Sequence, residues 1–261
     1  MNIIRVDSLD CEELTPYARL TERQLQERLH PEEGLFICES MKVVRVALAH
    51  GVEPVSFLCE EKFLSQIPEC CGVPVYTASR EVLKQLTGYE LSRGVLCAMR
   101  RPKLPRVDEV LRGACRVAVM DGVVNSENTG AIFRAAAALG MDAVLLTRTC
   151  CDPLNRRACR VSMGTVFQLP WAFLDHYGQL KEAGMTVVAL ALTDRSVSLG
   201  DAVLRGIDRM AVVLGSEGDG LSAAALGQAD YVVRIPMQRG VDSLNVAAAA
   251  AVAFWELRSC S

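Results

Sequence analysis

Short apolar runs alternate with longer stretches of helical periodicity along the whole chain of 261 residues. This alternation predicts an α/β fold with a largely parallel sheet, because each parallel strand needs a crossover, usually helical, before the next one. The predicted strands lie near residues 34–38, 55–59, 73–76, 94–99, 115–120, 143–147, 186–191, 210–214 and 231–235. The predicted helices lie near residues 14–29, 41–50, 79–86, 130–139, 155–162, 173–183, 222–227 and 243–257.

The segment from Arg100 to Arg106 interrupts this alternation with two prolines and four cations. Such a segment suits neither the interior of a strand nor that of a helix, so it is typical of an exposed linker. We therefore expect a small α/β domain at residues 1–100, a linker at 101–106 and a second domain at 107–261.

Composition limits the classes of protein that the chain can represent. Twenty-eight Lys and Arg against 31 Asp and Glu give a net charge of −3, which disfavours nucleic-acid binding by bulk charge but leaves local basic patches open. The 11 cysteines are odd in number and form no C-x-x-C pair, so we expect a reducing compartment and no metal site. The longest apolar run, residues 246–255, is about half of the roughly 20 residues that span a membrane. Without a signal pattern at the N-terminus, we expect a cytoplasmic protein with no membrane partner.

Three polar loops follow predicted strands, and each leads into a helix. Residues 121–130 lead into the helix that carries Arg134, with Asn128 or Thr129 as the expected N-cap. Residues 215–220 read G-x-x-G-x-G, which is neither the dinucleotide fingerprint nor a phosphate loop. Residues 235–245 join a strand to the last helix, with Ser243 as its expected N-cap. Each loop alone is compatible with a plain connection, but ligands bind beyond the carboxyl ends of strands in open α/β sheets, so the three together predict one site.

These loops resemble the three motifs of the SpoU/TrmH group of SPOUT RNA ribose 2′-O-methyltransferases. The matching residues are Asn128-x-Gly130-x-x-x-Arg134, then Leu214-Gly215-Ser216-Glu217-Gly218-x-Gly220, then Ile235-Pro236-Met237 through Ser243-Leu244-Asn245. Residues 160–164 are similar to a family segment between the first two motifs, and residues 34–39 and 93–96 resemble the L30e-like RNA-binding domain of many members. One departure is Arg239, where many relatives have a glycine and this chain has it one residue later.

The resemblance implies a deep trefoil knot in the C-terminal domain, S-adenosylmethionine as cofactor and a homodimer formed through the knot. The implied catalytic residues are Arg134, Asn128, Glu217, Ser243 and Asn245. The implied cofactor-binding residues are Leu214, Gly215, Glu217, Gly218, Ile235, Met237, Ser243 and Leu244. A homodimer would explain why residues 246–255 have no polar face, although burial of this helix in the core explains it equally well.

The implied reaction is methyl transfer to a ribose 2′-hydroxyl of structured RNA, with ribosomal RNA favoured over transfer RNA by the accessory domain. A guanidinium is essentially never deprotonated in proteins, so Arg134 is not expected to act as a base. Arg134 is expected instead to hold a phosphate beside the target ribose. An oxygen of that phosphate then assists in removing the proton of the 2′-hydroxyl. RNA contact is expected at Arg148, Arg156, Arg157 and Arg160. The segment that contains them, residues 148–160, has only one acidic residue, Asp152.

Two other functions remain open at the level of the sequence. A non-catalytic RNA-binding or ribosome-assembly factor could keep the same fold, although all the polar residues of the motifs are present. A SPOUT enzyme that methylates a base is the second alternative, which the set of Asn128, Arg134, Ser243 and Asn245 disfavours.

Overall fold

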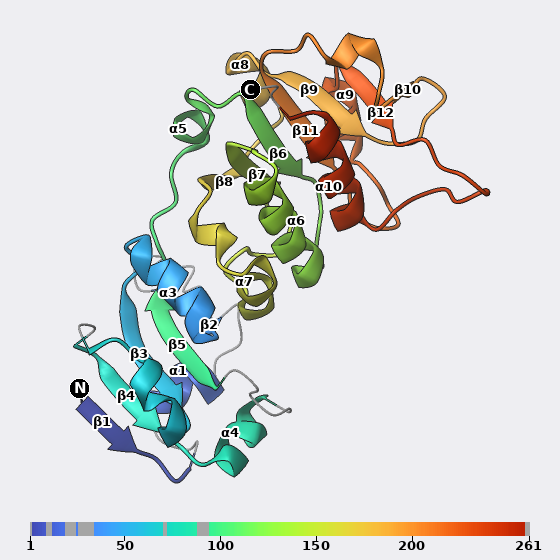
Figure 1. Cartoon of the computed structure of the whole chain (residues 1–261). Coiled ribbons are helices and arrows are strands. Elements are labelled where there is room, and N and C mark those ends of the chain that lie inside the picture. The colour runs from blue at the N-terminus through green and yellow to red at the C-terminus, as the bar shows by residue number, and fades with distance from the viewer. Residues whose placement is uncertain are drawn as a thin grey trace. The chain divides into compact units, whose positions relative to one another are not determined.

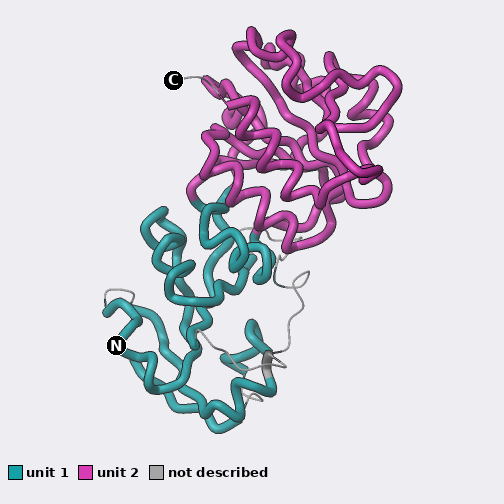
Figure 2. Tube along the Cα trace, turned by 45° about the vertical axis from the view of Figure 1, so that its right-hand side comes forward, with its two compact units in different colours: residues 1–103, 154–167 teal, residues 104–153, 168–261 magenta. Residues whose placement is uncertain are grey.

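The computed structural model describes residues 2–8, 12–18, 25, 34–69, 72–87 and 94–258. The chain forms two compact units, one of residues 1–103 with 154–167 and one of residues 104–153 with 168–261 (Figure 2). The first passage between the units falls within the predicted linker at 101–106. The return of residues 154–167 to the first unit is a feature that the sequence did not indicate.

The first unit is built on a five-stranded sheet in the order β1-β4-β3-β5-β2 (Figure 1). Strand β5 runs antiparallel to β2 and β3, and the remaining pairs are parallel. Its strands are β1 (Asn2–Arg5), β2 (Leu35–Glu39), β3 (Pro54–Cys59), β4 (Pro74–Thr77) and β5 (Val95–Arg100). Its helices are α1 (Thr15–Ala18), α3 (Met41–Ala49), α4 (Arg80–Thr87) and α7 (Arg156–Ser162). Most of the predicted helix at 14–29 and the resemblance at Arg93 lie outside the described residues.

Helix α7 packs against β2 of the first unit. Glu39, at the end of β2, is 4% exposed. Its carboxylate forms ion pairs with the guanidinium groups of Arg156 and Arg160, at N–O distances of 3.0 and 3.1 Å. The ring centroids of Phe36 and Phe167 lie 5.8 Å apart. A buried carboxylate needs such partners, so these pairs explain why residues 154–167 belong to the first unit.

The second unit contains a seven-stranded parallel sheet in the order β10-β12-β9-β11-β6-β7-β8. Its strands are β6 (Arg116–Met120), β7 (Ala143–Thr147), β8 (Trp171–Leu174), β9 (Thr186–Leu190), β10 (Val197–Ser198), β11 (Met210–Leu214) and β12 (Tyr231–Arg234). Its helices are α5 (Val107–Leu111), α6 (Ser126–Ala138), α8 (Gly178–Glu182), α9 (Ala223–Gln228) and α10 (Val246–Glu256). The α/β class and the parallel sheet of this unit are therefore confirmed.

One predicted helix, at residues 173–183, is wrong over its first part. Residues 171–174 form the edge strand β8, and a helix begins only at Gly178. Trp171 and Leu174 pair in register with Val144 and Thr147 of β7 and are buried. Burial against a neighbouring strand thus overrides the helical pattern of this short apolar run.

Helices cover both faces of the second sheet. One core cluster joins α5, α8 and α9 to alternate residues of the strands, while α6 and α10 lie side by side over the other face (Figure 1). Ala250, Ala253 and Phe254 of α10 are fully buried, whereas Val252 is 41% and Trp255 58% exposed. Among the described residues, no helix is both long and apolar enough to cross a membrane.

Candidate active site

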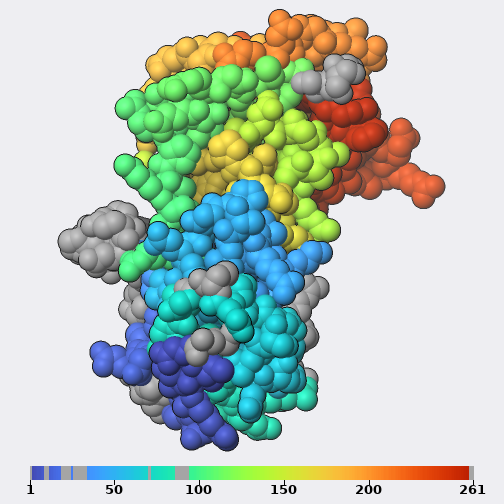
Figure 3. All heavy atoms as spheres, turned by 60° about the vertical axis from the view of Figure 1, so that its left-hand side comes forward, coloured from blue at the N-terminus to red at the C-terminus, as the bar shows by residue number. Residues whose placement is uncertain are grey.

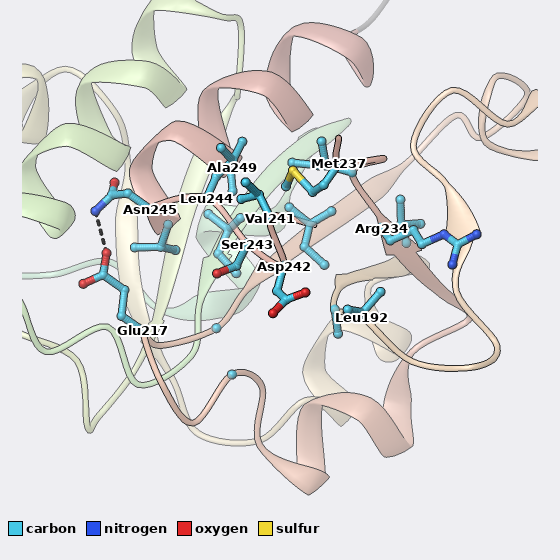
Figure 4. A pocket seen from close by; sticks show the side chains of 18 of the residues that line it. Leu192, Glu217, Arg234, Met237, Val241, Asp242, Ser243, Leu244, Asn245 and Ala249 are labelled. Carbon is cyan, nitrogen blue, oxygen red and sulfur yellow. Dashed lines mark hydrogen bonds between the residues drawn. The ribbon is translucent and has the colours of Figure 1, made fainter. Parts of the chain in front are cut away.

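A cavity of about 980 Å³ lies in the second unit at the carboxyl ends of β9, β11 and β12 (Figure 4). It is lined by residues 190–192 after β9, 214–218 and 220 after β11, 233–237 around the end of β12, and 241–246 leading into α10. The predicted cofactor-binding residues Leu214, Gly215, Glu217, Gly218, Ile235, Met237, Ser243 and Leu244 all line it. The three strand ends therefore meet where the topology rule for open sheets expects a ligand.

The glycine-rich loop after β11 forms one wall of the cavity by folding back on itself. The backbones of Ser216 and Gly220 exchange hydrogen bonds of 3.0 and 3.2 Å. A Cβ atom added at Gly215 would lie 2.4 Å from the carbonyl carbon of Gly220. The close approach of these two backbone segments therefore requires glycine at position 215.

The loop between β12 and α10 forms the opposite wall and stands out from the body of the second unit (Figures 1 and 3). Asn245, not Ser243, is the N-cap of α10, because its Oδ1 accepts hydrogen bonds from the amides of Ala247 and Ala248 at 3.0 and 3.4 Å. The prediction of Ser243 as the cap was wrong. Ser243 is exposed and lines the cavity instead.

The side chain of Asn245 connects its own loop to the glycine-rich loop and to the first turn of α6. Its Nδ2 donates to Oε1 of Glu217 in the glycine-rich loop, drawn as a dashed line in Figure 4, and to Oδ1 of Asn128 at 3.0 Å. Asn128 belongs to the first turn of α6 and is 8% exposed. Three residues that lie far apart in the sequence thus form one hydrogen-bonded chain beside the cavity.

Asn128 is free for this contact because another residue caps α6. The N-cap is Asn125, whose side chain accepts from the amides of Glu127 at 2.8 Å and Asn128 at 3.1 Å. The expected cap at Asn128 or Thr129 was therefore wrong by one turn. Helix α6 begins at Ser126, four residues before the predicted start at Gly130.

Arg134 lies two turns into α6 and is exposed to solvent. Within the described part of the chain, no acidic side chain or carbonyl oxygen pairs with its guanidinium. An unpaired arginine with five N–H donors is suited to bind an anion from outside the protein.

The four arginines of the predicted RNA patch have different surroundings. Arg148, in the second unit, is exposed and pairs with Asp175 at 2.8 Å. Arg156, Arg157 and Arg160 belong to α7 of the first unit, where two of them neutralise Glu39 and Arg157 is exposed. The cations therefore have structural partners as well as accessible surface.

Several residues of the cavity were not predicted from the sequence, among them Leu190, Leu192, Ser198, Arg234 and Asp242. In Figure 4, Arg234 and Leu192 lie on the side of the cavity away from Asn245 and Glu217. The end of β9 could have been included by the rule that ligands bind at carboxyl ends of strands. Arg234 carries no local sequence signal, because its place at the cavity depends on the strand order.

The cavity suits a cofactor that carries both an apolar ring system and positive charge. Leu190, Ile235, Met237 and Leu244 offer apolar surface, and the turns of the glycine-rich loop expose backbone groups. The carboxylates of Glu217 and Asp242 face the same space and are complementary to a cation. Among the residues that the structure describes, no cluster of His, Cys, Asp or Glu could hold a metal ion.

A parallel α/β sheet with such a cavity at the carboxyl ends of its strands is typical of ligand-binding proteins of the open-sheet class. Residues 116–255 match the SpoU rRNA Methylase family, and the chain belongs to that family. It is 42% identical over 232 residues to an uncharacterized tRNA/rRNA methyltransferase of Mycobacterium bovis, covering 86% of this chain and 81% of that protein. It is 32% identical over 214 residues to a 23S rRNA (guanosine-2′-O-)-methyltransferase of Bordetella pertussis, covering 75% and 82%.

The fold also resembles solved structures. An rRNA methyltransferase of Sinorhizobium meliloti, in its crystal structure with bound AdoMet, superposes with a TM-score of 0.83 at 23% identity, covering 98% of this chain and 97% of that one. An RNA 2′-O ribose methyltransferase superposes with a TM-score of 0.74 at 28% identity, covering 97% and 98%. The predicted family, and with it a class of RNA methyltransferase, is confirmed.

Proposed function

We propose that this protein methylates a ribose 2′-hydroxyl of ribosomal RNA with S-adenosylmethionine as the methyl donor. The observation that carries the proposal is the hydrogen-bonded chain of Glu217, Asn245 and Asn128, which joins one residue of each family motif beside the cavity. The relative from Bordetella pertussis, named for guanosine 2′-O-methylation of 23S rRNA, supports this substrate class.

S-adenosylmethionine supplies a methyl group that is already activated on a sulfonium centre. Leu214, Gly215, Gly218, Ile235, Met237 and Leu244 would hold its adenosine by apolar contact and backbone groups. Glu217 and Asp242 would face its positive charges. What the protein adds is mainly orientation, because holding two reactants in line supplies several kcal/mol of the barrier, of the order of 7–11 in favourable systems.

Arg134 binds a phosphate of the RNA next to the target ribose in this mechanism. Its guanidinium stays protonated, so it positions the hydroxyl, and an oxygen of the bound phosphate takes the proton. The exposure of Arg134 and the lack of a partner among the described residues support this role. Ser243, exposed at the rim of the cavity, would orient the ribose by a neutral hydrogen bond.

The remaining parts of the chain fit the same function. The first unit, residues 1–103 with 154–167, acts as an L30e-like RNA-binding domain, and the second unit, residues 104–153 with 168–261, acts as the methyltransferase domain. Arg148, Arg156, Arg157 and Arg160 contact the RNA backbone. The segments after β11 and β12 form a deep trefoil knot, and α10 packs against a second copy of the chain. The protein acts in the cytoplasm.

The experiment is methyl transfer from labelled S-adenosylmethionine to ribosomal RNA of cells that lack the protein, followed by digestion to nucleosides and mass analysis. We expect a methyl group on one ribose with the wild type and none with Arg134→Ala, which should bind S-adenosylmethionine with unchanged affinity. A methylated base would identify the base methyltransferase instead. RNA binding without any transfer would favour an assembly factor, and near wild-type turnover by Arg134→Ala would refute the role of this residue.

A further inference from the structure

Asp121 binds both ends of the glycine-rich loop after β11. It directly follows β6, and its backbone amide donates a hydrogen bond of 2.8 Å to the carbonyl of Leu214, the last residue of β11. Its side-chain Oδ2 accepts a hydrogen bond of 2.7 Å from the amide of Ser222, where the chain enters α9. The two ends of residues 215–221 are therefore held by one residue of the neighbouring strand end.

The two hydrogen bonds differ in what they require of position 121. The bond to Leu214 continues the ladder between β6 and β11 by one residue, and any residue except proline would donate it. The bond from Ser222 requires the side chain. Asp121 is 6% exposed, and a carboxylate buried to this extent is costly unless it is hydrogen-bonded. Because a charged acceptor binds an amide about twice as strongly as a neutral one, the contact with Ser222 is the specific contribution of this aspartate.

The loop between the two anchor points is a wall of the cofactor cavity. The backbones of Ser216 and Gly220 pair with each other, so the loop is a closed turn whose position is set at its base. Glu217, within this turn, lines the cavity and reaches Asn245 (Figure 4). Asp121 does not line the cavity, so it can affect a bound cofactor only through the loop.

Ser222 fixes the base of the loop to the following helix. Its Oγ accepts a hydrogen bond of 3.2 Å from the amide of Ala225 and caps α9. The same residue thus uses its side chain for the helix and its backbone amide for Asp121. A movement of the loop away from β6 would break the contact with the carboxylate, while the cap of α9 could remain.

We infer that Asp121 is a positioning residue for S-adenosylmethionine, because its carboxylate holds the glycine-rich loop in the conformation that forms the cavity wall. The inference rests on the proposed function and deepens it. It assigns part of the cofactor affinity to a side chain that lies outside the cavity and outside the residues matched to the three motifs.

The direct test compares Asp121→Ala with Asp121→Asn. Alanine removes the acceptor, whereas asparagine keeps an oxygen that can accept from the amide of Ser222. The matched control is Asp142→Ala, because Asp142 accepts from the amides of Cys115 and Arg116 at 2.8 Å each, at the opposite end of β6. Each variant is measured for thermal unfolding, calorimetric affinity for S-adenosylmethionine, hydrogen exchange of residues 214–222 without cofactor, and methylation of ribosomal RNA transcribed in vitro.

We expect Asp121→Ala to lose at least about tenfold in affinity for S-adenosylmethionine, the lower end of the range for a hydrogen bond to a charged group. The KM for S-adenosylmethionine should rise by the same factor, while kcat at saturating cofactor stays within about threefold of the wild type. Residues 216–222 should exchange faster than in the wild type. Asp121→Asn and Asp142→Ala should both keep the cofactor affinity within about threefold. Equal losses in Asp121→Ala and Asp142→Ala, an unchanged affinity of Asp121→Ala, or an equally weak Asp121→Asn would overturn the inference.

A second comparison removes the donor and leaves Asp121 in place. The φ of Ser222 is −63°, which proline adopts, so Ser222→Pro deletes the amide hydrogen at a compatible backbone angle. Ser222→Ala is its control, because both variants lack the hydroxyl that caps α9 and only alanine keeps the amide. Ser222→Pro should bind S-adenosylmethionine at least about tenfold more weakly than Ser222→Ala. The difference should disappear in the Asp121→Ala background, where the bond is already absent. Equal affinities of the two variants, or a difference that persists without the carboxylate, would refute this contact as the cause.

The exchange measurement separates this inference from the proposed function. If the wild type binds no S-adenosylmethionine, the proposed function fails. The exchange rates of residues 214–222 in the absence of cofactor still decide whether Asp121 holds the loop. Rates that are the same in the wild type and in Asp121→Ala would show that it does not.

Discussion

Asp230 links three elements of the second unit through one carboxylate. It accepts a hydrogen bond from the amide of Val187 at 2.8 Å and forms an ion pair with Lys181 of α8. Partial burial opposes its ionisation, but the Lys181 ammonium and the Val187 amide outweigh this and hold the pKa of Asp230 below its usual value. A group whose pKa is lowered by folding stabilises the native state above its unfolded pKa and loses that contribution as the pH falls through the folded pKa.

We therefore predict that Asp230→Asn lowers the free energy of unfolding at pH 6 and has a shrinking effect as the pH falls below about 4. Urea denaturation of both proteins between pH 2 and 6 measures the difference. The asparagine keeps an oxygen for the Val187 amide, so the pH-dependent part reports the charge alone. A difference that stays constant across this range would show that the ion pair has no role in acid stability.

Ser40 has a backbone conformation that residues other than glycine rarely adopt. Its φ is +84° directly before α3, and its own side chain forms no cap to the helix. A Cβ atom in a left-handed region costs about 1–2 kcal/mol, and glycine avoids this at a loss of about 0.5–1 kcal/mol in chain entropy. Ser40→Gly should raise the free energy of unfolding by about 0.5–1 kcal/mol in urea titrations. Ser40→Ala keeps the Cβ atom and should give no gain, so equal stabilisation by both would refute backbone strain as the cause.

At the scale of single residues, the sequence allowed the members of the site to be named but not their contacts. Asn128, Glu217 and Asn245 were all expected in the site from the family motifs. That Asn245 caps a helix and donates to Glu217 and Asn128 depends on which strand ends are neighbours, and residues 117 positions apart carry no local signal of contact. The same limit explains the wrong choice of Ser243 as the cap, because serine and asparagine are equally good acceptors at an N-cap.

Among the elements, the loop after β11 has a conformation that requires glycine at position 215. The backbone of Gly220 occupies the space that a side chain at position 215 would need. Gly215→Ala should force these segments apart, open the wall of the cavity and lower the affinity for S-adenosylmethionine by at least about tenfold. Gly227→Ala is the matched control, because nothing lies within 4 Å of a Cβ atom there and its φ is ordinary. Calorimetric titration of both variants checks the prediction, and equal affinities would contradict it.

Elements with strong patterns were easier to predict than short edge elements. The central strands β7 and β11 begin and end at the predicted residues, since their apolar runs are buried on both faces of a parallel sheet. The sequence pattern predicts a helix where the edge strand β8 forms, and it predicts no element at β1, β10 or α5. These pieces are short, and their structure depends on neighbours that local periodicity does not reveal.

For the molecule as a whole, the net charge of −3 does not tell how the charges are distributed over the surface. The arginines of α7 lie close to one another in the sequence, yet two of them neutralise Glu39, 117 and 121 positions away. The insertion of residues 154–167 into the first unit follows from these pairs and from the aromatic contact of Phe167. A division of the chain into successive domains could not include it, because the segment interrupts the second unit in sequence.

The exposed face of α10 leads to a prediction about assembly. Ala248, Val252 and Trp255 occur at intervals of four and three residues, so they lie on one side of the helix, and all three are exposed. An apolar stripe of this kind marks an interaction surface, and its proposed occupant is the same stripe of a second copy.

Val252→Glu would place an unpaired carboxylate at the centre of that contact, which costs several kcal/mol and weakens association by at least about 100-fold. Light scattering during gel filtration should give about twice the 28.4 kDa chain mass for the wild type and a single chain mass for the variant. Val203→Glu, at a valine that is 43% exposed against 41% for Val252, should stay dimeric. A monomeric wild type, or a dimer that survives Val252→Glu, would mean that this stripe is not the interface.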